Sequence, residues 1–147
     1  MKIKNVVVIG SGTMGCGIAA HLCNANVPVT LLDLKTEISE KARERIYKSK
    51  PPLLLDKSKI NNINAGNIND DFQVVKDADW IVEAVVERID IKHNIYQKIF
   101  KERKKGAIVS SNTSSIPIKF YLKIYLMKKK KIFALLIFLT QLDTWVF

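Results

Sequence analysis

Hydrophobic and polar positions follow two different patterns along the first 119 residues. Short runs of Val, Ile, Leu and Trp, bounded by Gly or polar residues, are typical of strands buried on both faces. Longer stretches repeat apolar residues every three or four positions, which is typical of helices that bury one face. The short runs predict strands at residues 5–9, 27–32, 72–75, 80–86 and 107–109, and the periodic stretches predict helices over 13–25, 36–50 and 89–104.

The order of these elements predicts an α/β fold. Strands that alternate with helices form a mostly parallel sheet, because each helix carries the chain back to the start of the next strand. Thr36 offers a helix N-cap, and Pro51-Pro52 ends the helix that follows it. Residues 53–71 are rich in Asn, Asp and Lys and show no period, so they predict a loop with at most one helical turn.

Composition narrows the class of protein. A chain of 147 residues with 48% apolar and 26% charged residues is typical of one globular domain. Cys16 and Cys23 lie on one predicted helix, too far apart to pair, and neither cysteine nor histidine shows metal-ligand spacing. We therefore expect no metal site, no disulfide and a cytoplasmic location.

The net charge of +10 is unevenly distributed. Residues 120–147 hold five of the 24 basic residues and one of the 14 acidic residues. In residues 1–119 the basic residues lie beside acidic ones along helices, without interleaved aromatic residues, which argues against nucleic-acid binding.

A glycine-rich loop follows the first predicted strand and opens the first predicted helix. It reads Gly10-Ser11-Gly12-Thr13-Met14-Gly15, and Asp33 ends the next strand. In this context the pattern predicts a dinucleotide site, with the pyrophosphate on the helix N-terminus and Asp33 on the adenosine ribose. The carboxylate repels a 2′-phosphate and favours NAD over NADP. The fold is therefore expected to be a Rossmann-type, doubly wound sheet.

A second group of candidates lies at the ends of later strands. Ala84 and Glu87 end the strand over 80–86, Lys92 follows on the next helix, and residues 110–115 read Ser-Ser-Asn-Thr-Ser-Ser. In a doubly wound sheet these positions share one edge with the glycine loop. Other interpretations remain open: Glu87 as a carboxylate that complements a helix dipole, Lys92 as a solvated lysine, and residues 110–115 as a plain loop.

Together these motifs resemble the NAD-binding domain of the 3-hydroxyacyl-CoA dehydrogenase family. The matching stretches are Val8–Ala19, Val82–Glu87 and Ser111–Ser115, and Lys48–Leu53 resembles the long members fused to an enoyl-CoA hydratase. The resemblance implies that Gly10–Gly15, Asp33, Ala84, Glu87, Lys92 and Ser114 contact NAD. It also implies that Ser114 touches the 3-hydroxyl of an acyl-CoA substrate, and that the intact proteins are oligomeric. Ser49, Lys50 and Lys57 are weak candidates for contacts with coenzyme A.

The resemblance covers residues 1–119, so the sheet is expected to be incomplete at its carboxyl-terminal end. In the family a His-Phe-Phe-Asn-Pro motif follows, whose His is the general base and is oriented by a Glu. Residues 120–147 contain neither, so no catalytic residue and no helical dehydrogenase domain is expected. The segment Ile132–Phe147 is too short and too polar for a membrane span, although a basic, apolar segment suits a membrane surface.

A third interpretation of residues 120–147 is translation in the wrong frame. Permitted codons for Phe133–Val146 read, in a shifted frame, Cys-Ile-Thr-His-Phe-Phe-Asn-Pro-Val-Arg-Tyr-Met-Gly. We therefore expect a frame change near Lys119 and a dehydrogenase domain that binds NAD but turns over little or no substrate. The alternatives are a non-enzymatic dinucleotide-binding module and a fragment associated with a membrane surface.

Overall fold

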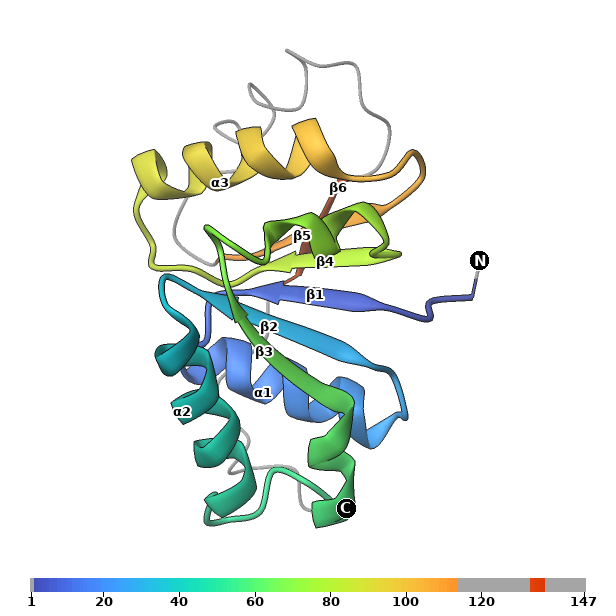
Figure 1. The fold of residues 1–147 in the computed structure, drawn as a ribbon, viewed down its shortest axis with the longest axis vertical. Coiled ribbons are helices and arrows are strands. Elements are labelled where there is room, and N and C mark those ends of the chain that lie inside the picture. Colours follow the sequence, from blue (N-terminus) through green and yellow to red (C-terminus); the bar gives the residue numbers. More distant parts are fainter. Residues whose placement is uncertain (1, 114–132, 137–147) are drawn as a thin grey trace.

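The computed structural model describes residues 2–113 and 133–136, and they form a twisted parallel sheet with helices on both faces (Figure 1). The sheet has six strands in the order β3-β2-β1-β4-β5-β6. Their bounds are β1 Val6–Ile9, β2 Val29–Asp33, β3 Ile63–Asn67, β4 Trp80–Glu83, β5 Ile108–Asn112 and β6 Phe133–Leu136. All five strand pairs are parallel, which confirms the predicted Rossmann-type architecture.

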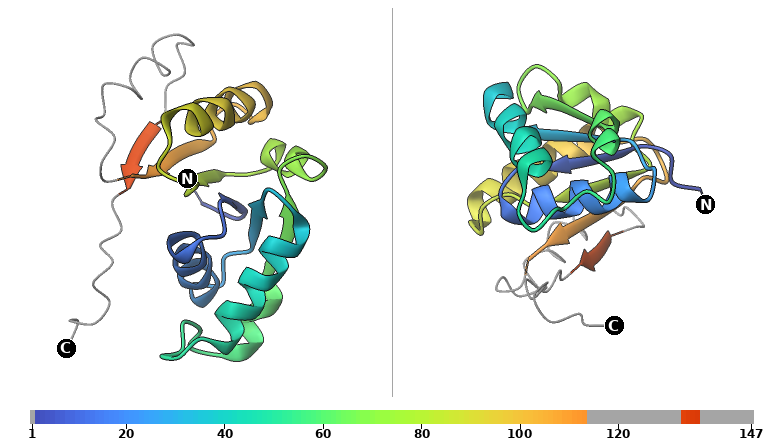
Figure 2. Two further views of the ribbon diagram at one scale, coloured as in Figure 1. Left: turned by 90° about the vertical axis from the view of Figure 1, so that its left-hand side faces the viewer. Right: turned by 90° about the horizontal axis from the view of Figure 1, so that it is seen from below.

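Helices cover the two faces unequally (Figure 2). Helices α1 (Thr13–Asn24) and α2 (Thr36–Lys48) lie on one face, and α3 (Ile89–Glu102) lies on the other with the short 3-10 helix η2 (Phe72–Lys76). Alternate residues of β1 serve the two cores: Val6 and Val8 pack with α1 and α2, whereas Val7 and Ile9 pack with α3. A strand buried on both faces explains the continuous apolar run in the sequence.

Strand order reverses between β1 and β4. The chain moves outward from β1 to β2 and β3, returns to β4 on the other side of β1, and then moves outward again to β5. Such a reversal leaves a crevice beyond the carboxyl ends of the two central strands, where ligands of doubly wound sheets bind. The candidate site lies at this point.

Two predictions about the connecting segments are wrong. Phe72–Val75 forms a 3-10 turn rather than a strand, because Phe72 and Val75 are buried at the three-residue spacing of that helix. Residues 63–67 form the edge strand β3, not a loop, although only Ile63 carries a large buried apolar side chain. A 3-10 turn, η1 (Lys57–Asn62), precedes it.

Smaller differences concern where elements begin and end. Lys35, not Thr36, occupies the N-cap of α2, and the Thr36 hydroxyl instead accepts a hydrogen bond from Asn67. Strand β5 continues through Asn112, and β4 ends at Glu83, so Ala84 already belongs to the loop. Strand β6 comes from the segment that was expected to lie outside the fold.

Both cysteines lie on the helix that the sequence predicts for them. Cys16 and Cys23 are both buried in α1 and are free thiols. Among the described residues, no helix is long and apolar enough to cross a membrane, and no group of His, Cys, Asp and Glu side chains is arranged to hold a metal ion.

Candidate functional site

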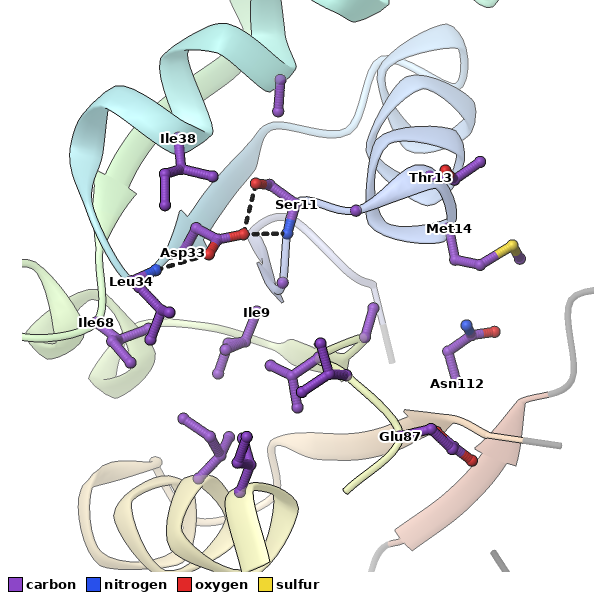
Figure 3. Close-up of a pocket in the computed structure, with 18 of the residues that line it drawn as sticks. Ile9, Ser11, Thr13, Met14, Asp33, Leu34, Ile38, Ile68, Glu87 and Asn112 are labelled. Carbon is purple, nitrogen blue, oxygen red and sulfur yellow. Dashed lines mark hydrogen bonds between the residues drawn. The ribbon is translucent and has the colours of Figure 1, made fainter. Parts of the chain in front are cut away.

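A cavity of about 1040 Å³ opens at the carboxyl edge of the sheet, where strand order reverses (Figure 3). Its walls come from the glycine loop, α2, the end of β2, the loop after β4, the start of α3 and the end of β5. The lining residues include Ile9, Gly10, Ser11, Gly12, Thr13, Met14, Asp33, Leu34, Ile38, Lys41, Arg45, Ala84, Glu87, Asn112 and Thr113. The volume is at the upper end of the range for small-molecule sites, as a dinucleotide requires.

Glycine is required at both ends of the loop. Gly10 adopts a φ of 104°, and a Cβ there would lie 2.4 Å from the carbonyl oxygen of Ala84. A Cβ on Gly15 would lie 1.9 Å from the carbonyl oxygen of Gly10, because α1 passes directly over the loop. These two glycines therefore let the loop turn tightly against β4 and let α1 pack against β1.

The middle of the loop is open toward the cavity. Gly12 is the N-cap of α1, and a Cβ there would meet no atom within 4 Å. The first N–H groups of a helix have no intrahelical acceptor, and Gly12 offers no side chain to them. These N–H groups carry the positive end of the helix dipole, so the arrangement suits a phosphate group.

Asp33 lies at the end of β2 and faces the loop (Figure 3). One carboxylate oxygen accepts hydrogen bonds from the Ser11 N–H at 2.7 Å and from the Ser11 hydroxyl at 2.5 Å. The other accepts one from the Leu34 N–H at 2.7 Å. These bonds fix the carboxylate in the cavity wall, beside the exposed apolar side chains of Leu34 and Ile38. A carboxylate next to an apolar shelf suits a ribose and the base attached to it.

Sequence reasoning missed two basic residues of α2 that also line this cavity, Lys41 and Arg45. Arg45 donates a hydrogen bond to the Ser11 carbonyl oxygen at 2.7 Å and contacts the Cys16 sulfur at 3.1 Å. This hydrogen bond connects α2 directly to the glycine loop. The helical spacing of Ile38, Lys41, Ala42 and Arg45, which places them on one face, is the signal that identifies them.

The other half of the cavity holds a buried polar network. Glu87 accepts a hydrogen bond from the Thr113 hydroxyl and lies 3.1 Å from the Lys92 ammonium. Lys92 is only 1% exposed, so the interpretation of this residue as a solvated lysine is wrong. Its Nζ lies 2.6 Å from Glu83, a residue of β4 that is itself fully buried.

Glu83 is the centre of this network, and sequence reasoning did not single it out. Its carboxylate accepts hydrogen bonds from Lys92, the Tyr96 hydroxyl, the Ser111 hydroxyl and the Val85 N–H. These partners belong to α3, β5 and the loop after β4. A glutamate in the middle of a buried apolar strand run is the signal that could have found it, because a buried charge is retained only with partners.

The structure therefore brings most of the predicted cofactor residues to one cavity. Gly10 to Met14, Asp33, Ala84 and Glu87 all line it. Gly15 instead lies on α1 against the Gly10 carbonyl group, and Lys92 contacts Glu87 but does not itself line the cavity. Ser114, the predicted contact for cofactor and substrate, lies outside the described residues.

Comparison with known proteins agrees with this geometry. Residues 5–138 match the family model of the 3-hydroxyacyl-CoA dehydrogenase NAD-binding domain. A protein of Deinococcus radiodurans named "Probable 3-hydroxyacyl-CoA dehydrogenase" is 42% identical over 125 residues, covering 80% of this chain and 36% of the relative. A Bacillus subtilis protein of the same name is 38% identical over 138 residues. The aligned region covers 80% of this chain and 18% of the Bacillus subtilis protein.

A solved structure shows the same arrangement of elements. The 3-hydroxybutyryl-CoA dehydrogenase of Escherichia coli superposes with a TM-score of 0.80 at 25% identity, over 98% of this chain and 31% of that one. The chain thus spans about a third or less of the relatives named here.

Proposed function

The chain belongs to the 3-hydroxyacyl-CoA dehydrogenase family, in which it corresponds to the NAD-binding domain, and on this premise we propose how its residues hold the cofactor. The observation that carries the proposal is the joint placement of the open α1 N-terminus and Asp33 in one cavity. The helix N–H groups bind the pyrophosphate, and Asp33 binds the adenosine ribose hydroxyls. Ala84 and Glu87 contact the nicotinamide half, and Lys92 acts through Glu87.

Titration of the full chain with NAD⁺ and NADP⁺ by calorimetry tests this assignment. We expect NAD⁺ to bind more tightly, because Asp33 meets the 2′-phosphate of NADP⁺ with like charge. Asp33→Asn should weaken NAD⁺ binding by about tenfold, as loss of a charged hydrogen bond does. It should also bring the Kd values of NAD⁺ and NADP⁺ closer together. Asp56→Asn is a matched control, because Asp56 likewise accepts from a backbone N–H but does not line the cavity. Equal effects of the two substitutions would overturn the assignment.

We propose that the reaction served is oxidation of a 3-hydroxyacyl-CoA to the 3-ketoacyl-CoA in fatty-acid β-oxidation. NAD supplies the acceptor for the hydride from C3. The printed sequence holds no His-Phe-Phe-Asn-Pro motif, the source of the general base in the family. We therefore expect the purified chain to bind NAD⁺ but to oxidise 3-hydroxybutyryl-CoA roughly 10²–10⁴-fold more slowly than an intact relative. An ordinary rate would refute this expectation.

The segment Phe133–Val146 permits a shifted reading frame, and the position of β6 in the sheet supports this part of the proposal. Strand β6 pairs with β5 so that Leu136 lies opposite Asn112, a residue of the cavity wall. In the shifted frame the codons of Leu136 and Ile137 permit His, which would then stand at the same edge as the cofactor residues. The gene sequence decides this. A Leu136–Ile137 junction that cannot encode His ends the proposal and favours a non-enzymatic dinucleotide-binding module.

We also propose an acyl-CoA partner, a cytoplasmic location and, for the intact protein, an oligomer. The free thiols of Cys16 and Cys23 support a reducing compartment. Flotation with anionic vesicles, with and without residues 120–147, tests the competing assignment to a membrane surface. Binding to vesicles that depends on these residues would contradict a purely cytoplasmic protein.

A further inference from the structure

Glu83 carries a charge in the least accessible part of the site. Its carboxylate is 0% exposed and lies 2.6 Å from the Lys92 ammonium, 2.8 Å from the Tyr96 hydroxyl and 2.6 Å from that of Ser111. The Val85 N–H adds a fourth hydrogen bond at 2.9 Å. Four donors therefore converge on the two carboxylate oxygens, which together offer about four acceptor sites.

Lys92 links this carboxylate to a second one. The ammonium lies 2.6 Å from Glu83 and 3.1 Å from Glu87, which lines the cavity. Two carboxylates and one ammonium together leave one negative charge. Arg88 and Asp90, the next charged residues along the chain, form an exposed pair of their own and cancel each other. The Arg88–Asp90 pair therefore adds no net charge to these three groups.

The position of this charge relative to the cofactor follows from the proposed function, on which the inference rests. With the adenosine ribose at Asp33 and the pyrophosphate at the glycine loop, the nicotinamide lies beyond the ends of β4 and β5. Glu83 is the last residue of β4, next to Ala84 in the cavity wall. The nicotinamide ring is positively charged in NAD⁺ and neutral in NADH.

We propose that Glu83 is a positioning residue that also sets the preference for the oxidised cofactor. It holds Lys92 against Glu87, and its charge leaves the three-group cluster Glu83–Lys92–Glu87 with a net charge of −1. This charge stabilises bound NAD⁺ relative to bound NADH and so favours the state from which a 3-hydroxyacyl substrate is oxidised. In a partly buried site such an effect is less screened by salt than one at the surface.

The test is a series of variants that step the cluster charge. The charge is −1 in the wild type, 0 in Glu83→Gln, −2 in Lys92→Met, and −1 again in the double variant. Selectivity, the ratio of the Kd for NADH to the Kd for NAD⁺, is measured by calorimetry on the full chain. We expect Glu83→Gln to lower selectivity on the order of tenfold and Lys92→Met to raise it similarly, as unit charges about 10 Å apart do in a protein. The double variant should return toward the wild-type ratio.

A purely structural role makes a different prediction. Disorder around Glu83 would weaken the binding of NAD⁺ and NADH to the same extent. The double variant would then bind both cofactors most weakly, and its selectivity would not recover. Glu102→Gln is the matched control. Glu102 forms an ion pair with Lys76 at the end of α3 far from Lys92, so its substitution should leave the selectivity unchanged. If Glu83→Gln does not fold, the step from Lys92→Met to the double variant measures the same charge.

The outcomes separate the two proposals. A wild-type chain that binds neither NAD⁺ nor NADH refutes the proposed function. A wild-type chain that binds both, with selectivity unmoved across the series or moved in the same direction by Glu83→Gln and Lys92→Met, refutes the role of Glu83 and leaves the cofactor assignment intact.

Discussion

Three glycines of the first loop and helix are expected to respond to alanine in three different ways. Gly15→Ala places a Cβ 1.9 Å from the Gly10 carbonyl oxygen and 2.9 Å from its carbon, so the loop backbone or α1 must move. Such overpacking costs roughly 1–3 kcal/mol, which lowers the Tm of a domain of this size by about 3–12 °C. The affinity for NAD⁺ should fall as well, because the displaced loop carries the proposed pyrophosphate site.

Gly12→Ala separates binding from stability. The new Cβ meets no protein atom within 4 Å, and it would occupy space that the proposed site assigns to the pyrophosphate. An alanine N-cap costs less than about 1 kcal/mol relative to glycine. Gly17→Ala is the control: its Cβ also meets nothing, but it lies inside α1 and not in the cavity wall, so it should stabilise the helix by roughly 0.5–1 kcal/mol.

Thermal melts with and without NAD⁺ distinguish the three variants. Ligand at 100 times its Kd stabilises the folded state by about 2.7 kcal/mol, so the wild type and Gly17→Ala should melt several degrees higher with NAD⁺. Gly12→Ala should melt near the wild-type temperature and gain nothing from NAD⁺. A Gly12→Ala variant that responds fully to NAD⁺ would show that the phosphate lies elsewhere, and an unchanged Tm for Gly15→Ala would refute the close approach of α1.

Three further results are expected. Arg45→Met removes the hydrogen bond to the Ser11 carbonyl and should weaken NAD⁺ about tenfold by calorimetry, whereas an unchanged Kd would mean that the loop holds its shape without α2. Bonds from Lys104 and from the N–H groups of Lys4 and Asn5 lower the pKa of Asp79 to about 2. The stability that this carboxylate contributes is therefore present above its ordinary pKa of 3.8 and is lost as the pH falls toward 2. Asp79→Asn should make the free energy of unfolding depend less steeply on pH between these values, as measured by circular dichroism. Burial raises the pKa of Cys23 to about 11, so a thiol reagent at pH 8 should label it only after unfolding; rapid labelling of the folded chain would contradict this.

The strong apolar runs made the central strands predictable, and the weak edges were missed for physical reasons. Strands β1, β2 and β4 are buried on both faces, so nearly every residue must be apolar. Strand β3 lies at the sheet edge and buries chiefly Ile63, so Asn64 and Asn67 concealed it as a loop. The apolar residues Phe72 to Val75 satisfy a 3-10 turn as well as a strand, since periodicity alone does not separate the two over four positions.

In the candidate site, too, residues that belong to a local motif were predictable, whereas contacts between distant parts of the chain were not. The Gly10–Gly15 loop and Asp33 were predictable because a local motif fixes their geometry. Helical spacing and a charge within an apolar run mark Arg45 and Glu83, but their partners were not predictable because the contacts join residues far apart in the chain. Arg45 meets Ser11 across 34 positions, and Glu83 meets Ser111 across 28. A single sequence carries no direct record of such pairings.

The distribution of buried polar groups explains why the two halves of the cavity differ. Toward β2 and α2, the site uses Asp33, backbone N–H groups and the apolar shelf of Leu34 and Ile38, all of which suit a cofactor half that does not react. Beyond β4 and β5, the fold buries Glu83 and Lys92, although burying an ion pair costs more than packing apolar residues of the same volume. Such a cost is expected where a charged side chain has an electrostatic role that an apolar side chain cannot replace. The nicotinamide ring is the part of the cofactor whose charge changes when a hydride is transferred, and in the proposed arrangement the buried charges lie on its side of the cavity.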